Sequence, residues 1–143
     1  MNPQSKLTLT GEEKWLVRQS FESAQEYADS LTKLFYGRLF DLRPELRALF
    51  KVSIEEQSRK LLDTLRIVVD ALDRFDDLRP QLADLGRKHI DYGAKPEHYD
   101  LVRTTLIWTF SQALGFEFDR STKAAWDSVL RAVAAAMLEG ARN

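Results

Sequence analysis

A histidine continues an apolar helical stripe in the second half of the chain. The stripe has spacings of four, three and four residues: Leu78, Leu82, Leu85, His89. Residues at this spacing lie on one face of a helix, so the imidazole of His89 should point inward. Such an imidazole either forms a hydrogen bond within the core or binds a metal ion through one ring nitrogen. The residues alone leave both interpretations open, and the first is the more common. The other histidine, His98, is interpreted as a surface residue.

Two further polar side chains interrupt apolar helical segments. Tyr36 stands between Phe35 and Gly37, and Gln57 lies at the inward edge of the segment 54–72. Each alone is more often a satisfied residue at the core boundary than part of a site. Together they are more informative, because a buried hydroxyl or amide without a partner costs about 1–3 kcal/mol. We therefore expect a polar group, a water molecule or a ligand, between them.

Helix signals recur along the chain, whereas strand signals are lacking. A Ser or Thr stands three residues before a Glu, the spacing of a capping box, in three places: Thr10–Glu13, Ser23–Glu26 and Ser53–Glu56. Pro44 and Pro96 suit the first turn of a helix. Asp119 or Ser121 could cap the N-terminus of a last helix. The sequence predicts an all-α fold of six or seven helices with short connections.

Composition excludes several classes of function. The 143 residues fit one domain, and 21 Lys and Arg against 22 Asp and Glu give a net charge of −1. There is thus no basic field for nucleic acid or an anionic membrane surface, and neither is expected as a partner. The absence of cysteine excludes disulfides, thiolate catalysis and iron–sulfur clusters. The first ten residues lack the apolar centre of a secretory signal, so a cytoplasmic location is expected.

The candidate residues together resemble a known family. The pattern consists of the following residues, with the phenylalanine fourteen positions after the tyrosine: Tyr36, Pro44, Phe50, Gln57, Leu61, Lys88 and His89. It resembles the globins, specifically the single-domain bacterial globins related to the globin module of flavohaemoglobins. The resemblance implies a globin fold over residues 9–143, with helices three over three around a pocket for haem b (iron protoporphyrin IX). Residues 1–8 are interpreted as an N-terminal extension, for which disorder is expected.

The resemblance implies a role for each of these residues. His89 matches the proximal histidine, which binds the haem iron. Tyr36 and Gln57 match the distal pair, whose phenol and amide stabilise a bound gas molecule. Phe50 matches the residue that packs on the porphyrin face, and Leu61 matches the apolar residue that limits access to the distal side.

On the proximal side the sequence departs from the flavohaemoglobins. Tyr99 matches their tyrosine beside the proximal histidine, but Ala141 stands where their last helix carries a glutamate. Glu139 is a poor substitute, because two residues rotate a helical side chain by about 200°. We therefore expect the second ring nitrogen of His89 to donate to a backbone carbonyl, such as that of Leu85. Such an imidazole is a weaker electron donor, which disfavours peroxidase-like chemistry.

Three functions remain open at this point. The first is a haem protein that reversibly binds dioxygen and other small gases such as CO and NO, as a carrier, store or sensor. The second is an enzyme, a nitric oxide dioxygenase whose electrons come from a separate reductase. The third is a haem-free globin-fold interaction module, in which His89 is structural.

Overall fold

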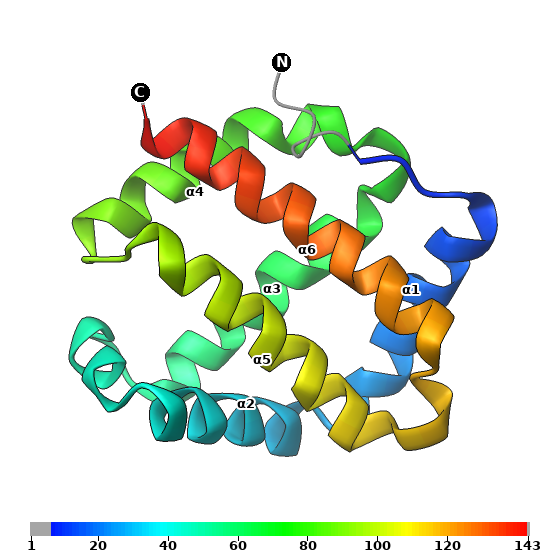
Figure 1. Ribbon diagram of the computed structural model, residues 1–143, viewed down its shortest axis with the longest axis horizontal. Helices are drawn as coiled ribbons and strands as arrows, with labels where there is room; N and C mark the ends of the chain where they lie inside the picture. The colour runs from blue at the N-terminus through cyan, green and yellow to red at the C-terminus, as the bar shows by residue number, and fades with distance from the viewer. Residues whose placement is uncertain (1–6, 143) are drawn as a thin grey trace.

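The computed structural model describes residues 7–142, and within this range the chain forms helices joined by short connections and no strand (Figure 1). The α-helices are α1 (Gly11–Gln25), α2 (Ala28–Leu42), α3 (Ile54–Asp70), α4 (Arg79–Asp91), α5 (Pro96–Leu114) and α6 (Arg120–Ala141). Three short 3₁₀ helices connect some of them: η2 (Pro44–Leu49), η3 (Leu72–Leu78) and η4 (Gly115–Glu117). The prediction of an all-α fold is confirmed. Most of the expected N-terminal extension, residues 1–6, lies outside the described residues.

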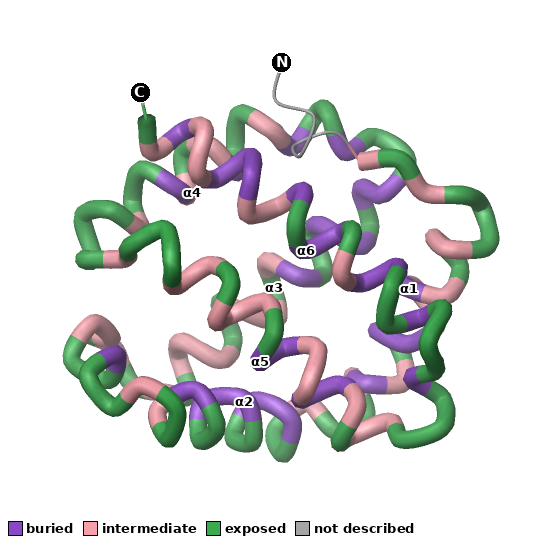
Figure 2. The backbone as a smooth tube through the Cα atoms, in the orientation of Figure 1, coloured by how far each residue is buried: buried purple, intermediate pink, exposed green. Residues whose placement is uncertain are grey.

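The helices pack in two layers that cross. In Figure 1, α5 and α6 lie in front of α3, with α4 along the upper edge of the molecule and α2 along the lower edge. The faces that these helices turn toward one another are largely buried, and the loops at the ends are exposed (Figure 2). No helix in the described range is long and apolar enough to cross a membrane.

Most of the predicted helix ends are present. The Thr10 hydroxyl accepts a hydrogen bond from the backbone N–H of Glu13, whose carboxylate accepts one from the N–H of Thr10, so this capping box is complete. At the start of α3 the Ser53 hydroxyl accepts from the N–H of Glu56 at 3.2 Å. Asp119, and not Ser121, caps α6. Each cap satisfies a backbone N–H that would otherwise lack a partner.

The predicted helix start at Ser23 is wrong. Ser23 lies inside α1, and its hydroxyl donates to the carboxylate of Glu117 in η4. Helix α2 instead begins after Tyr27, which makes no capping hydrogen bond with its side chain. A serine three residues before a glutamate can also occur inside a helix. There its hydroxyl is free to form a hydrogen bond with a distant segment, as Ser23 does with Glu117.

A buried tryptophan organises the core between α1, α5 and α6. Trp126 has no exposed surface, and its indole N–H donates to the Ser20 hydroxyl at 2.7 Å. Its ring centroid lies 4.8 Å from that of Phe110 and 6.2 Å from that of Phe21. The apolar rings and the satisfied indole nitrogen together fix how the last helix sits on the first.

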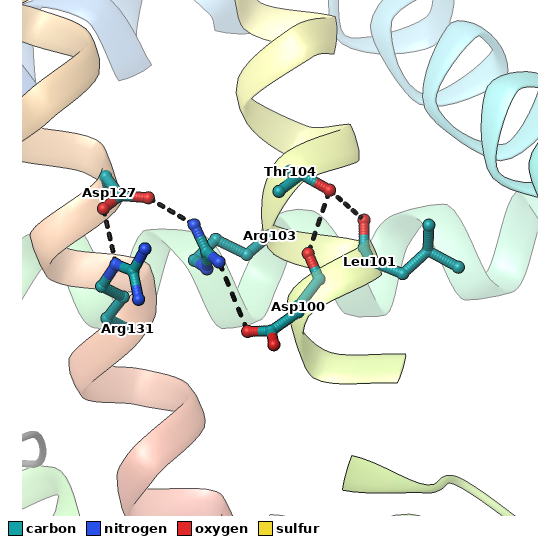
Figure 3. A network of polar contacts seen from close by, with 6 residues as sticks. All are labelled: Asp100, Leu101, Arg103, Thr104, Asp127 and Arg131. Atoms are coloured by element: carbon teal, nitrogen blue, oxygen red, sulfur yellow. Dashed lines mark hydrogen bonds and ion pairs between the residues drawn. The ribbon is translucent and has the colours of Figure 1, made fainter. Parts of the chain in front are cut away.

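A charged network joins α5 to α6 near the start of α5 (Figure 3). Arg103, with 12% of its side chain exposed, donates to Asp127 on α6 and to Asp100 one turn earlier on its own helix. Asp127 also accepts from Arg131 at 2.7 Å. The two arginines therefore share one carboxylate across the helix pair.

Candidate functional site

Tyr36, Phe50 and Gln57 come together from three consecutive elements. Tyr36 lies on α2, Phe50 directly follows η2, and Gln57 lies in the first turns of α3. The Tyr36 hydroxyl donates to the backbone carbonyl of Gln57 at 3.4 Å, and the ring centroids of Tyr36 and Phe50 are 5.7 Å apart. The structure thus places the phenol beside the α3 residue that the sequence paired with it, although the bond goes to the backbone carbonyl rather than to the side-chain amide.

A third aromatic ring completes this group, which we call the distal group (Tyr36, Phe40, Phe50 and Gln57). The Phe40 ring lies 6.0 Å from that of Tyr36 and 5.4 Å from that of Phe50. The sequence pattern did not identify Phe40 as a site residue. Its position four residues after Tyr36, on the same face of α2, was the available signal.

Burial controls the protonation of Tyr36. The residue is 4% exposed, and desolvation raises the pKa of its phenol well above the ordinary value. The phenol is therefore neutral throughout the physiological range and keeps its proton. Because its hydrogen bond is long at 3.4 Å, it can turn to a better acceptor at small cost.

Leu61 follows Gln57 by one helical turn on α3. It is partly buried and packs against the core.

The second group lies at the end of α4 and the start of α5. His89 is in the last turn of α4, partly buried, and its Nδ1 lies 2.8 Å from the backbone carbonyl oxygen of Leu85. A carbonyl oxygen can accept but not donate, so Nδ1 carries the proton and the Nε2 of the neutral imidazole carries a free lone pair. This is the backbone hydrogen bond that the sequence predicted.

The pKa of His89 supports the same protonation state. Burial lowers it below the ordinary value, and the hydrogen bond to the Leu85 carbonyl offsets part of this decrease. The residue is therefore neutral at physiological pH. A neutral imidazole held by a second partner is the donor that haem iron uses in proteins, so the side chain fits a haem group.

Two tyrosines flank the imidazole of His89. The Tyr99 ring on α5 has its centroid 6.4 Å from that of His89, and burial raises the pKa of its phenol. The Tyr92 ring is nearer, at 5.8 Å, and was not singled out from the sequence. Tyr92 could have been identified from its position three residues after His89, because residues at this spacing are neighbours on a helix. We call His89, Leu85, Tyr92 and Tyr99 the proximal group.

Contacts between neighbouring segments tie the elements of the two groups together. Arg43, at the start of η2, lies 3.9 Å from Glu97 in the first turn of α5. Leu49, at the end of η2, lies against Gly93, which has a φ of +92° and ends the α4 segment. No hydrogen bond or ring contact among residues 7–142 joins a side chain of the distal group directly to one of the proximal group.

Two hollows border the proximal group without including His89. One, of about 150 Å³, lies between α3 and α4 and is lined in part by Leu85. The other, of about 650 Å³, lies between α5 and α6 and is lined in part by Tyr99.

The second histidine has a local task. The Nδ1 of His98 accepts a hydrogen bond from the backbone N–H of Lys95 at 3.0 Å and so helps to begin α5. This leaves His89 as the better candidate for a metal ligand.

Comparison with curated proteins gives several relatives of similar distance. The chain is 26% identical to a flavohemoprotein of Halalkalibacterium halodurans over 91% of its own length, but spans only 32% of that protein. It is 28% identical to a neuroglobin of Tetraodon nigroviridis, with 92% of both chains covered. It is 27% identical to an uncharacterized globin-like protein of Aquifex aeolicus, with 78% and 82% covered.

Solved structures of similar fold include two bacterial proteins. One is an engineered carbene transferase made from a putative nitric oxide dioxygenase of Rhodothermus marinus, with a TM-score of 0.82, 24% identity and 94% of both chains covered. The other is a bacterial globin of Campylobacter jejuni, with a TM-score of 0.80, 22% identity, and 93% and 96% covered. At these identities the comparison establishes the fold.

The family model for globins matches residues 33–137, a range that begins in α2 and ends in α6. It includes every residue of the distal and proximal groups. The predicted globin fold is confirmed, and the chain belongs to the globin family.

Proposed function

We propose that this globin binds haem b through the Nε2 of His89 and reversibly binds dioxygen, together with CO and NO. The observation that carries the proposal is the hydrogen bond from His89 Nδ1 to the Leu85 carbonyl, because it presents the unprotonated nitrogen as a ligand atom. Bound haem would be held by the imidazole of His89 and would supply an iron atom able to bind a small diatomic gas.

The distal group supplies the polar contact to the gas in this proposal. The neutral phenol of Tyr36 is a hydrogen-bond donor, and the amide of Gln57 provides a second donor type on the adjacent helix. Phe50 offers a flat apolar ring, and Leu61 keeps the space small. Exclusion of bulk water strengthens a hydrogen bond from Tyr36, because the local dielectric constant is lower than in water.

The proximal group favours reversible binding over oxidative chemistry. The partner of His89 is a neutral carbonyl and not a carboxylate, so the imidazole donates less electron density than one paired with an anion. This supports a role as a carrier, store or sensor of dioxygen.

A nitric oxide dioxygenase is the second candidate. The observation in its favour is the pairing of a phenol and an amide residue in the distal group, combined with similarity to a flavohemoprotein and to a protein described as a putative nitric oxide dioxygenase. In this role the chain would depend on a separate reductase to return the iron to its ferrous state.

The first test is the absorption spectrum of the purified protein supplied with haem, recorded in the ferric, reduced and CO-bound states. His89→Ala is compared with wild type, and His98→Ala serves as the matched control because it removes the other imidazole. We expect wild type and His98→Ala to show the same shifts of the Soret band, and His89→Ala to lose or change them. Equal spectra for all three proteins would refute His89 as the ligand and bring forward the haem-free interaction module.

A second measurement separates the two functions. The oxygenated protein is mixed with NO in a stopped-flow instrument, and nitrate is determined afterwards. Reversible oxygen binding as the main role predicts slow loss of the oxygenated spectrum and little nitrate. Rapid conversion with one nitrate per haem would instead establish the dioxygenase, and the search for a reductase would follow.

A further inference from the structure

Helices α4 and α6 cross with their backbones in direct contact. At Gly86 on α4, the position that a Cβ atom would occupy lies 1.9 Å from the carbonyl oxygen of Met137 on α6. At Gly140 on α6, the corresponding position lies 2.0 Å from the carbonyl oxygen of Ala83 on α4. Each helix therefore contributes one glycine and one carbonyl group to an antiparallel crossing.

No side chain larger than hydrogen fits at either glycine. The atoms in the way belong to the backbone, so no change of rotamer can make room, and real Cβ atoms essentially never approach another atom within 3.0 Å. An alanine at Gly86 or Gly140 would force the helices apart by more than 1 Å at this point. At Gly37, in contrast, a Cβ would meet no heavy atom of the described residues within 4 Å, apart from its chain neighbours and the nearby backbone of its own helix.

The crossing lies within one helical turn of His89. Gly86 precedes His89 by three residues, and the carbonyl that holds its Nδ1 belongs to Leu85, the residue before Gly86. The imidazole is thus fixed to a stretch of α4 whose position is itself fixed by α6. A displacement of α4 at the crossing would carry both the imidazole and its hydrogen-bond partner with it.

We propose that Gly86 and Gly140 are positioning residues, which fix α4 against α6 and thereby set how far His89 reaches toward a bound haem iron. The proposal rests on the proposed function, because it takes His89 as the iron ligand. It gives Gly140 on α6 a role in positioning His89, although His89 lies on a different helix, α4.

Resonance Raman spectroscopy of the reduced, gas-free protein measures the proximal bond directly, as the iron–histidine stretching vibration. Gly86→Ala and Gly140→Ala should both move this band from its wild-type position and in the same direction, since both open the same crossing. The matched control Gly37→Ala should leave the band in place. The double variant should shift it less than the sum of the single shifts, because the second methyl group enters a crossing that is already widened.

A detached ligand separates positioning from general structural damage. In a His89→Gly background supplied with imidazole, the ligand is no longer attached to α4. Gly140→Ala should then leave the iron–imidazole band unchanged. A shift of equal size in this background would overturn the proposal, because the effect would not pass through α4 and His89.

A measurement on the wild-type chain decides the matter if the alanine variants do not fold. Amide hydrogen exchange is followed in the full chain with and without haem. If the crossing holds α4, amides of residues 83–89 stay protected without haem, unlike those of the turn at 93–95. Equal, fast exchange in both segments overturns this proposal.

Absence of haem binding in wild type overturns the proposed function and this inference with it, whereas retained haem with unshifted bands overturns this inference alone.

Discussion

At the scale of single residues, the site consists of side chains that burial keeps neutral. Desolvation raises the pKa of Tyr36 and lowers that of His89, so at neutral pH the phenol retains its proton and the imidazole retains its lone pair. Neither residue is paired with a formal charge in the contacts described. The distal group thus offers a neutral hydrogen-bond donor, and the proximal group offers a neutral imidazole with a free lone pair on Nε2.

Replacing Tyr36 with Phe should speed the release of dioxygen. A hydrogen bond to an acceptor with partial negative charge contributes about 1.5–3 kcal/mol, so the dissociation rate should rise roughly tenfold or more. Release of CO, a poorer hydrogen-bond acceptor, should change much less. Both rates are measured by ligand-replacement stopped flow.

Tyr27→Phe is the matched control, because it removes the phenol oxygen of a half-exposed tyrosine at the start of α2. It should leave both rates as in wild type. Equal dioxygen release from Tyr36→Phe and wild type would show that the phenol does not contact the gas.

The sequence was sufficient for some contacts of the site and insufficient for others. The bond from His89 to the Leu85 carbonyl was predictable, because a carbonyl four residues earlier is always within reach on a helix. The bond from Tyr36 to the backbone of Gln57 was not, because it depends on how α2 crosses α3. Phe40 was overlooked for a different reason: its side chain carries no reactive or polar group, and only its position one turn after Tyr36 pointed to the site.

At the scale of helices, the local capping patterns located most helix N-termini. They could not distinguish a serine that caps a helix from one that has the same spacing to a glutamate by chance. Ser53 and Ser23 show the same spacing to a glutamate, yet only Ser53 begins a helix. The difference arises from tertiary contacts, because α1 continues past Ser23 and η4 supplies the partner for its hydroxyl.

Ser53→Ala should lower the stability of the protein by about 1 kcal/mol, the usual cost of removing an N-cap side chain. The matched control is Ser121→Ala, which replaces a serine in the first turn of α6 that is not its N-cap. The control should stay within about 0.5 kcal/mol of wild type. Urea unfolding followed by circular dichroism gives both values, and equal losses would contradict the cap assignment.

The α4–α6 crossing should be intolerant of added volume. Gly140→Ala should destabilise the fold by about 1–3 kcal/mol, the range for overpacking a close contact. Gly37→Ala should instead stabilise it by roughly 0.5–1 kcal/mol, because alanine is the better helix former and the position is open. Opposite signs for the two substitutions in urea unfolding are the expected result, and a stabilising Gly140→Ala would show that the helices separate freely.

At the scale of the whole molecule, the fold class was accessible from the sequence because helical period, caps and prolines agreed along the chain. The pairing of α4 with α6 was not accessible. Gly86 and Gly140 are far apart in sequence. Neither glycine indicates a close helix contact until the fold places the two helices against each other. The sequence therefore predicted which helices form better than it predicted how closely they approach.

The network between α5 and α6 should make global stability depend on pH in the acid range. Burial raises the pKa of Asp127, but hydrogen bonds from Arg131 and Arg103 outweigh this, and the net pKa lies below its usual value. Because the folded pKa is below the unfolded one, the unfolded chain binds more protons as the pH falls. The stabilisation is thus present above the unfolded pKa of about 3.9 and is lost as the pH falls through the folded pKa.

Asp127→Asn tests this linkage, because asparagine keeps the shape of the side chain and removes its charge. We expect the variant to be less stable than wild type from neutral pH down to about pH 5, and the difference to shrink below that as the wild-type carboxylate takes up its proton. Urea unfolding midpoints at a series of pH values measure the difference. A gap of equal size at neutral and acid pH would mean that Asp127 stabilises the α5–α6 pair by packing and not by its charge.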